Sequence, residues 1–138
     1  MVVTREITLN TRGECDIIDI TPDIEQEVAK AGMAKGVVTI FVAGSTAGLT
    51  TIEFESGVLT DLQGMWERIV PKDITYAHDR RWGDGNGYSH VRASLLGASL
   101  TVPFSNKRLM VGTWQQIVLV DFDNRSRSRQ VILQIMGE

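Results

Sequence analysis

The segment Val37-Val38-Thr39-Ile40-Phe41-Val42-Ala43 is rich in β-branched residues and contains no charged side chain. Such a run is typical of a strand in the middle of a sheet that is covered on both faces. It belongs to the longest apolar run of the chain, which is far shorter than the roughly 20 residues of a membrane-spanning helix. The segment therefore predicts a central strand of a globular domain, with no membrane association.

A helix is predicted on each side of this strand. Thr21 is suited to be an N-cap and Pro22 to be the first helical residue, and the first helix ends near Gly32. A second helix is predicted over 57–70, with Ser56 as its N-cap and apolar side chains at helical spacing.

The rest of the chain shows strand signals. Apolar–polar alternation predicts strands over 3–10 and 15–20, joined as a hairpin, and a late meander over 99–104, 109–122 and 130–136. Two early helices and a late run of strands indicate an α+β fold in a single domain, 1–138. The expected scaffold is an antiparallel β-sandwich with two main helices.

The composition is that of a soluble globular protein of 138 residues, 43% apolar and 22% charged, with a net charge of −3. Residues 1–79 carry 6 basic and 13 acidic side chains, whereas residues 80–138 carry 8 basic and 4 acidic ones. The basic half can bind a phosphorylated ligand, but it lacks the clustered cations and aromatic residues of a nucleic-acid interface. The single cysteine, Cys15, and the absence of a signal peptide favour a cytoplasmic protein.

Both histidines of the chain bracket one glycine-rich loop, which runs from His78 to His90 within the longer polar segment 72–89. Its glycines allow the loop to double back and bring both imidazoles to one point. Histidine titrates near neutral pH and is the commonest metal ligand, so the loop is a candidate acid–base or metal site. The alternative is a solvated loop in which 83–87 only provides turns.

The segment Gly44-Ser45-Thr46-Ala47-Gly48 resembles a backbone cradle for an anion. It matches neither a P-loop nor a dinucleotide-binding fingerprint, and a structural bend is the alternative. Glu53 follows on a predicted strand. Its side chain belongs either to a solvated face or to the same cleft as the histidines, where it would act as a general base or metal ligand.

Two further features favour structural interpretations. Trp114 and Gln115 lie in the late strand region, where a tryptophan is more often core than a binding platform. Arg125, Arg127 and Arg129 alternate at a predicted hairpin tip. Solvated or subunit-bridging arginines are more common there than a phosphate clamp.

Five blocks of the sequence together resemble one family. They are FVAGSTAGLTTIE (41–53), WGDGNGYSH (82–90), GASLTVP (97–103), GTWQQI (112–117) and DFDNR (121–125). In combination they are similar to those of the YjbQ-like family of small prokaryotic proteins, often labelled secondary thiamine-phosphate synthase. The resemblance extends over nearly the whole chain.

The resemblance implies a sandwich-like α+β subunit that assembles as a homotrimer. It also implies a cleft that gathers Glu53, His78, Asn86, His90, Trp114 and Gln115. Relatives commonly carry a histidine at the position of Gly44, so a three-histidine metal site is reduced here to His78 and His90, with Glu53 as the third partner. The metal expected there is a divalent cation, zinc or magnesium.

Two functions follow as hypotheses. The first is weak thiamine-phosphate-synthase-type activity, which joins a pyrimidine diphosphate to a thiazole phosphate and releases pyrophosphate. Ser45, Thr46 and Arg81 would hold the phosphates. Glu53, His78 and His90 would move protons or hold the metal. The second hypothesis is a small-ligand or metal-binding homotrimer without physiological turnover; steady pyrophosphate release distinguishes the two.

Overall fold

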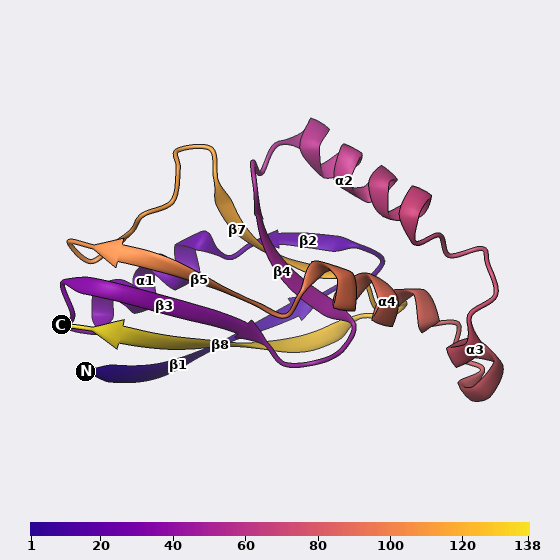
Figure 1. Ribbon diagram of the computed structural model, residues 1–138, viewed down its shortest axis with the longest axis horizontal. Helices are drawn as coiled ribbons and strands as arrows, with labels where there is room; N and C mark the ends of the chain where they lie inside the picture. Colours follow the sequence, from indigo (N-terminus) through magenta and orange to yellow (C-terminus); the bar gives the residue numbers. More distant parts are fainter.

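Two antiparallel sheets and four helices form the computed structural model, which describes residues 1–138 (Figure 1). The strands are β1 (Val2–Thr11), β2 (Asp16–Asp19), β3 (Lys35–Val42), β4 (Ala47–Ile52), β5 (Ser99–Ser105), β6 (Arg108–Leu109), β7 (Gln116–Asp121) and β8 (Arg127–Gly137). The helices are α1 (Thr21–Lys30), α2 (Ser56–Ile69), α3 (Ala77–Trp82) and α4 (Gly87–Leu96). The five-stranded sheet has the order β1-β8-β3-β5-β6, and the three-stranded sheet has the order β2-β7-β4. The predicted α+β class with an antiparallel scaffold is confirmed.

β3 is the middle strand of the five-stranded sheet. On one face Val38 and Ile40 are fully buried, whereas on the other Val37 and Phe41 are 37% and 44% exposed. The prediction that this strand is covered on both faces is therefore wrong for the single chain, because only one of its faces packs against other elements.

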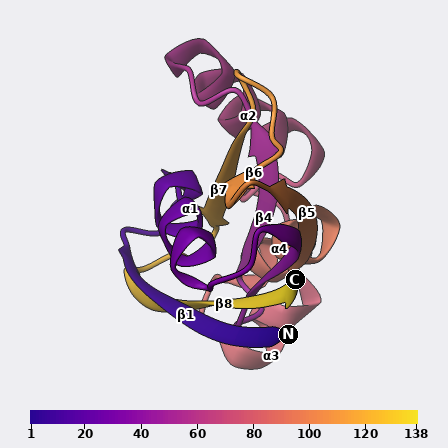
Figure 2. The same cartoon turned by 90° about the vertical axis from the view of Figure 1, so that its left-hand side faces the viewer.

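The strand that is covered on both faces is β7. Ile117 and Leu119 belong to a core shared with the five-stranded sheet and α1, which lies within the curve of that sheet (Figure 2). Val118 and Val120 belong to a second core that contains residues of α2 and α4. The three-stranded sheet is thus the middle layer, and α2 and α4, the helix that holds His90, pack against it.

Two predicted strand pairings are wrong. The hairpin expected for 3–10 and 15–20 does not form, because β1 pairs with β8 and β2 pairs with β7. The late strands do not form a meander, because β7 and β8 lie in different sheets. β8 instead lies between β1 and β3 and brings the two ends of the chain together, where the Met1 ammonium group donates a hydrogen bond of 2.9 Å to the Gly137 carbonyl (Figure 1).

The two early helices form as predicted, but the predicted N-caps are wrong. Thr21 is the first residue of α1, and the N-cap position is Ile20, without a side-chain cap hydrogen bond. α2 begins at Ser56, but its N-cap is Glu55, whose carboxylate accepts hydrogen bonds of 2.8 and 2.9 Å from the N–H groups of Gly57 and Val58. These hydrogen bonds hold the pKa of Glu55 below its usual value. None of the four helices has the length and hydrophobicity needed to cross a membrane.

The segment 72–89, predicted to be a long loop, contains α3 and the start of α4. α3 ends at Gly83, whose φ of +68° places it in the left-handed region that glycine adopts without strain. α4 begins at Gly87 and continues to Leu96.

Candidate functional site

The helices α3 and α4 bring the two histidines together. The ring centroids of His78 and His90 lie 4.6 Å apart, and the ring planes are inclined by 40°. Asp79 ties the two helices to each other, because its Oδ1 accepts a hydrogen bond of 2.8 Å from the N–H of Gly87. A Cβ at Gly87 would lie 2.7 Å from Cβ of Tyr76, so a glycine is needed for this close approach. The segment between the histidines doubles back through short helices rather than through an open loop.

His78 also faces two carboxylates. Its Nδ1 lies 3.4 Å from Oδ1 of Asp84 and 3.8 Å from Oδ1 of Asp79, and this buried atom makes no hydrogen bond. Ligand atoms of the three residues all lie within 4.8 Å of one another. One imidazole nitrogen and two carboxylates fit a divalent cation, and the nitrogen favours zinc over magnesium.

His90 lines a pocket of about 320 Å³ next to the turn between β3 and β4. The lining residues are mostly small: Gly44, Ser45, Ala47, His90, Ala93, Ser94, Gly97 and Ala98. His90 is the only ionisable residue among them, and Ser45 and Ser94 bring hydroxyl groups. The pocket therefore combines a potential proton donor with room for a small polar group.

Thr46 and Asn86 were predicted to bind ligand, but both side chains are buried and turned toward Asp123. Oδ2 of Asp123 accepts hydrogen bonds from the Thr46 hydroxyl, at 2.9 Å, and from the Asn86 amide, at 3.3 Å. The Asn86 carbonyl accepts a 2.6 Å hydrogen bond from the Ser89 hydroxyl. These predictions are corrected, because neither side chain is free to bind a ligand. Through Asp123, Thr46 and Asn86 hold the turn between β3 and β4 next to the start of α4.

Asp123 is the buried carboxylate that accepts hydrogen bonds from both Thr46 and Asn86. Burial by itself would raise its pKa, but the hydrogen bonds from Thr46, Asn86 and Arg127 together outweigh burial and hold the pKa below its usual value. Arg127 donates from Nε at 3.0 Å and is therefore an ion-pair partner rather than part of a solvated hairpin tip.

Arg129 is a buried charged residue near the pocket. Its position at a predicted hairpin tip favours a solvated or subunit-bridging role instead. Its Nε donates a hydrogen bond to Asp121, and its Nη2 donates to Asp121 and to the Thr46 hydroxyl. A signal for its burial was present in the sequence, because Arg129 shares the period-2 alternation of Val131, Leu133 and Ile135, which all face the core.

Glu53 does not lie with the histidines in a single chain. It lines a separate pocket of about 410 Å³, together with Trp114 and the N-cap residue Glu55. The predicted trio of His78, His90 and Glu53 is therefore not assembled within one subunit, because the acidic neighbours of His78 are Asp79 and Asp84 while Glu53 lines a different pocket from His90.

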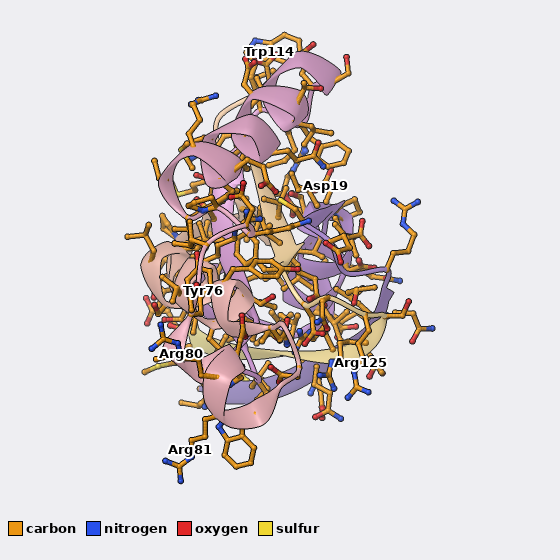
Figure 3. All side chains as sticks on the ribbon, turned by 90° about the vertical axis from the view of Figure 1, so that its right-hand side faces the viewer. Asp19, Tyr76, Arg80, Arg81, Trp114 and Arg125 are labelled. Atoms are coloured by element: carbon orange, nitrogen blue, oxygen red, sulfur yellow. The ribbon has the colours of Figure 1, made fainter.

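Three further predicted ligand residues also lie elsewhere. Figure 3 shows Trp114 at one end of the molecule and Arg81 at the opposite end. The Arg81 guanidinium is exposed and lies 5.8 Å from the centre of the Trp82 ring. Gln115 lines a third pocket and donates a hydrogen bond of 3.1 Å to the Thr51 hydroxyl. A single subunit thus gathers only Ser45, His78 and His90 of the predicted set at one place.

Comparisons with known proteins agree along the whole chain. A family model described as "UPF0047 protein YjbQ-like" matches residues 5–138. A UPF0047 protein of Methanothermobacter thermautotrophicus is 36% identical over 137 residues, which cover 99% of this chain and 94% of the relative. The UPF0047 protein YugU of Bacillus subtilis is 33% identical over 138 residues, covering 99% and 100%.

Solved structures agree with the fold. A YbjQ-like protein of unknown function from Sulfolobus solfataricus is similar with a TM-score of 0.93 at 33% identity, over 100% of this chain and 99% of that one. An uncharacterised protein of the same family from Clostridium acetobutylicum gives a TM-score of 0.86 at 32% identity, over 96% and 99%.

Proposed function

The chain belongs to the UPF0047 YjbQ-like family, and on that basis we propose that it catalyses a thiamine-phosphate-synthase-type condensation in the pocket beside His90. A pyrimidine diphosphate and a thiazole phosphate would give thiamine phosphate and pyrophosphate. The observation that supports the proposal is the pairing of His78 and His90, with ring centroids 4.6 Å apart, at a pocket built from the 44–47 turn.

The main requirement of this reaction is to stabilise the negative charge on the leaving pyrophosphate. The bond between the pyrimidine methylene carbon and the diphosphate oxygen breaks, the thiazole nitrogen forms the new C–N bond, and pyrophosphate carries away the electron pair. Donors aimed at the departing oxygens stabilise this charge. His90 and the Ser45 hydroxyl would donate to these oxygens, and His78 would orient the His90 ring by contact. The Ser94 hydroxyl already donates to the Val91 carbonyl, at 2.9 Å.

The test is steady-state release of pyrophosphate with both substrates, compared with each substrate alone. We expect His90→Ala and His78→Ala to abolish release while leaving the free energy of unfolding within about 1 kcal/mol of wild type, because both side chains lie outside the two cores. Wild-type rates for both variants contradict the proposal, and so does a wild-type protein that releases no pyrophosphate.

Glu53→Gln distinguishes two arrangements of this site. If the site is complete within one subunit, the variant keeps wild-type turnover, because Glu53 lines a different pocket. If turnover falls with that of the histidine variants, the partner subunit's Glu53 completes the site.

A divalent metal site without turnover is the second candidate function, and the cluster of His78, Asp79 and Asp84 favours it. We expect one Zn²⁺ per chain in a calorimetric titration, and loss of this binding in His78→Ala and Asp84→Asn. Asp73→Asn is the matched control, because Asp73 is an exposed carboxylate outside the cluster. Equal zinc binding by all variants contradicts this candidate.

We also propose that the chain assembles as a homotrimer through the outer face of the five-stranded sheet. Val2 lies opposite Met136, Met136 opposite Val37, and Val37 opposite Pro103, so that one apolar stripe crosses four strands. All four side chains are exposed in the single chain. An uncovered apolar stripe of this width is typical of a protein–protein interface.

A further inference from the structure

The Arg129 side chain lies against Gly44, next to the pocket beside His90 but not among the residues that line it. The Arg129 side chain is 8% exposed, and its Nε and Nη2 are occupied by hydrogen bonds to Asp121 and Thr46. Its third nitrogen, Nη1, makes no hydrogen bond within the chain. Nη1 is also absent from the fully buried polar atoms that lack a partner, which are on Trp66, His78 and Arg92, so it remains accessible to solvent.

The absence of a side chain at Gly44 leaves room for Nη1. A Cβ built on Gly44 would lie 2.6 Å from Nη1, and no other group but this guanidinium lies within 4 Å of that position. Gly44 itself lines the pocket with Ser45 and His90. The guanidinium therefore points at the wall of the pocket where glycine leaves space, and any side chain at position 44 would compete with it.

The orientation of the guanidinium is fixed before any ligand arrives. Asp121 holds two of its three nitrogens, in hydrogen bonds of 2.7 and 2.9 Å, and Oδ2 of Asp123 lies 3.8 Å from Nη2. An arginine whose rotamer is already set loses little conformational entropy when it binds an anion.

We propose that Nη1 of Arg129 is the anion-binding group of this pocket and holds a phosphoryl oxygen of the ligand, with Ser45 and His90 on the other side. The inference rests on the part of the proposed function that places a phosphorylated ligand in the pocket. Gly44 acts as a positioning residue, because its missing side chain admits the guanidinium.

The experiment is a titration with inorganic phosphate, followed by NMR of ¹⁵N-labelled arginine side chains. In the wild type we expect the Arg129 guanidinium resonances to shift with saturation, and those of the exposed Arg81 to stay unchanged. Gly44→Ala adds one methyl group 2.6 Å from the position of Nη1, so the guanidinium has to move away from the pocket wall. We expect its phosphate affinity to be about tenfold lower, which corresponds to the loss of one hydrogen bond to a charged group.

Gly32→Ala is the matched control, because Gly32 also has a positive φ, of +80°, but has no atom within 4 Å of an added Cβ. It carries similar backbone strain without touching the pocket, so we expect wild-type phosphate affinity. If Gly44→Ala fails to fold, the response of the Arg129 resonances in the wild-type phosphate titration tests the proposal without the variant.

Three outcomes separate this inference from the proposed function. Phosphate binding without an Arg129 shift, or with equal affinity in Gly44→Ala, overturns the role of Arg129. No phosphate binding by the wild type overturns it as well. A clear Arg129 shift in a protein that releases no pyrophosphate from the two substrates supports the anion site and contradicts the transferase.

Discussion

Arg129 and Asp121 form a buried ion pair that joins the two sheets, since Arg129 comes from β8 of the five-stranded sheet and Asp121 from β7 of the three-stranded one. The Thr11 hydroxyl of β1 adds a hydrogen bond of 2.6 Å to the same carboxylate. The sheets are thus connected by a charge-assisted contact as well as by apolar packing.

Asp121→Asn should therefore be strongly destabilising. The substitution removes the charge that binds Nε and Nη2 of Arg129 and leaves only the Asp123 carboxylate, 3.8 Å from Nη2, near the buried guanidinium. Breaking such a buried pair typically costs about 3–5 kcal/mol. Urea unfolding measures the loss. Glu138→Gln is the control, because Glu138 forms an exposed ion pair with Lys35, and we expect a change of less than about 1 kcal/mol. Equal losses of unfolding free energy for the two substitutions would show that the buried ion pair stabilises the fold no more than the exposed one.

The stability of the fold should fall in acid because of Asp123. The pKa of this carboxyl is lower in the folded protein than its usual value of 3.8, so the unfolded chain binds the proton more readily than the folded one. The stabilisation is complete above pH 3.8 and is lost as the pH falls through the folded pKa. We expect the difference in unfolding free energy between wild type and Asp123→Asn to shrink between about pH 5 and pH 2. A difference that is constant with pH would contradict this role.

Cys15 should be unreactive in the folded protein. Burial raises the pKa of its thiol from 9.0 to about 11, so that the thiolate fraction at pH 8 is about a hundredfold lower than for a free cysteine. Ellman's reagent should therefore label the native protein slowly and the guanidinium-unfolded protein at once. Fast labelling of the native protein would indicate that the thiol is accessible and ionised.

Val37→Lys should disrupt the proposed homotrimer. The new charge would lie in the apolar stripe, between Met136 and Pro103, where its burial in an interface is unfavourable. Light scattering should give the mass of a trimer for the wild type and of a monomer for the variant. Ile74→Lys alters an exposed apolar residue outside the stripe and should remain trimeric. A monomeric wild type at micromolar concentration contradicts the assembly.

The sequence was sufficient for the class of fold, because helical spacing and strand alternation are local signals. It could not rank two apolar strand-like runs by burial. Both 37–43 and 117–120 are apolar, and only the layering of sheets and helices determines that β7 is covered on both faces while Val37 and Phe41 remain exposed. Strand pairing failed for a related reason: β1 and β8 are more than a hundred residues apart, and no turn signal connects them.

The candidate site was predicted in part. The glycine-rich segment between His78 and His90 correctly suggested that the imidazoles meet, because that contact depends on a short stretch of chain. Thr46 and Asn86 were placed in the ligand site because nothing local shows that Asp123, far along the sequence, accepts their hydrogen bonds. Arg129 was discounted as a surface residue although its strand alternation places it on the core side.

The position of β8 between β1 and β3 has a consequence for biosynthesis. While residues 127–137 are still inside the ribosome, β1 has no partner strand, and β3 presents unpaired backbone groups along the edge that β8 later covers. The ion pair between the sheets is also incomplete, because Arg129 is not yet available to Asp121. Cooperative folding of the nascent chain must therefore wait for its final strand, and until then the exposed edges of β1 and β3 are the surfaces that a chaperone has to protect.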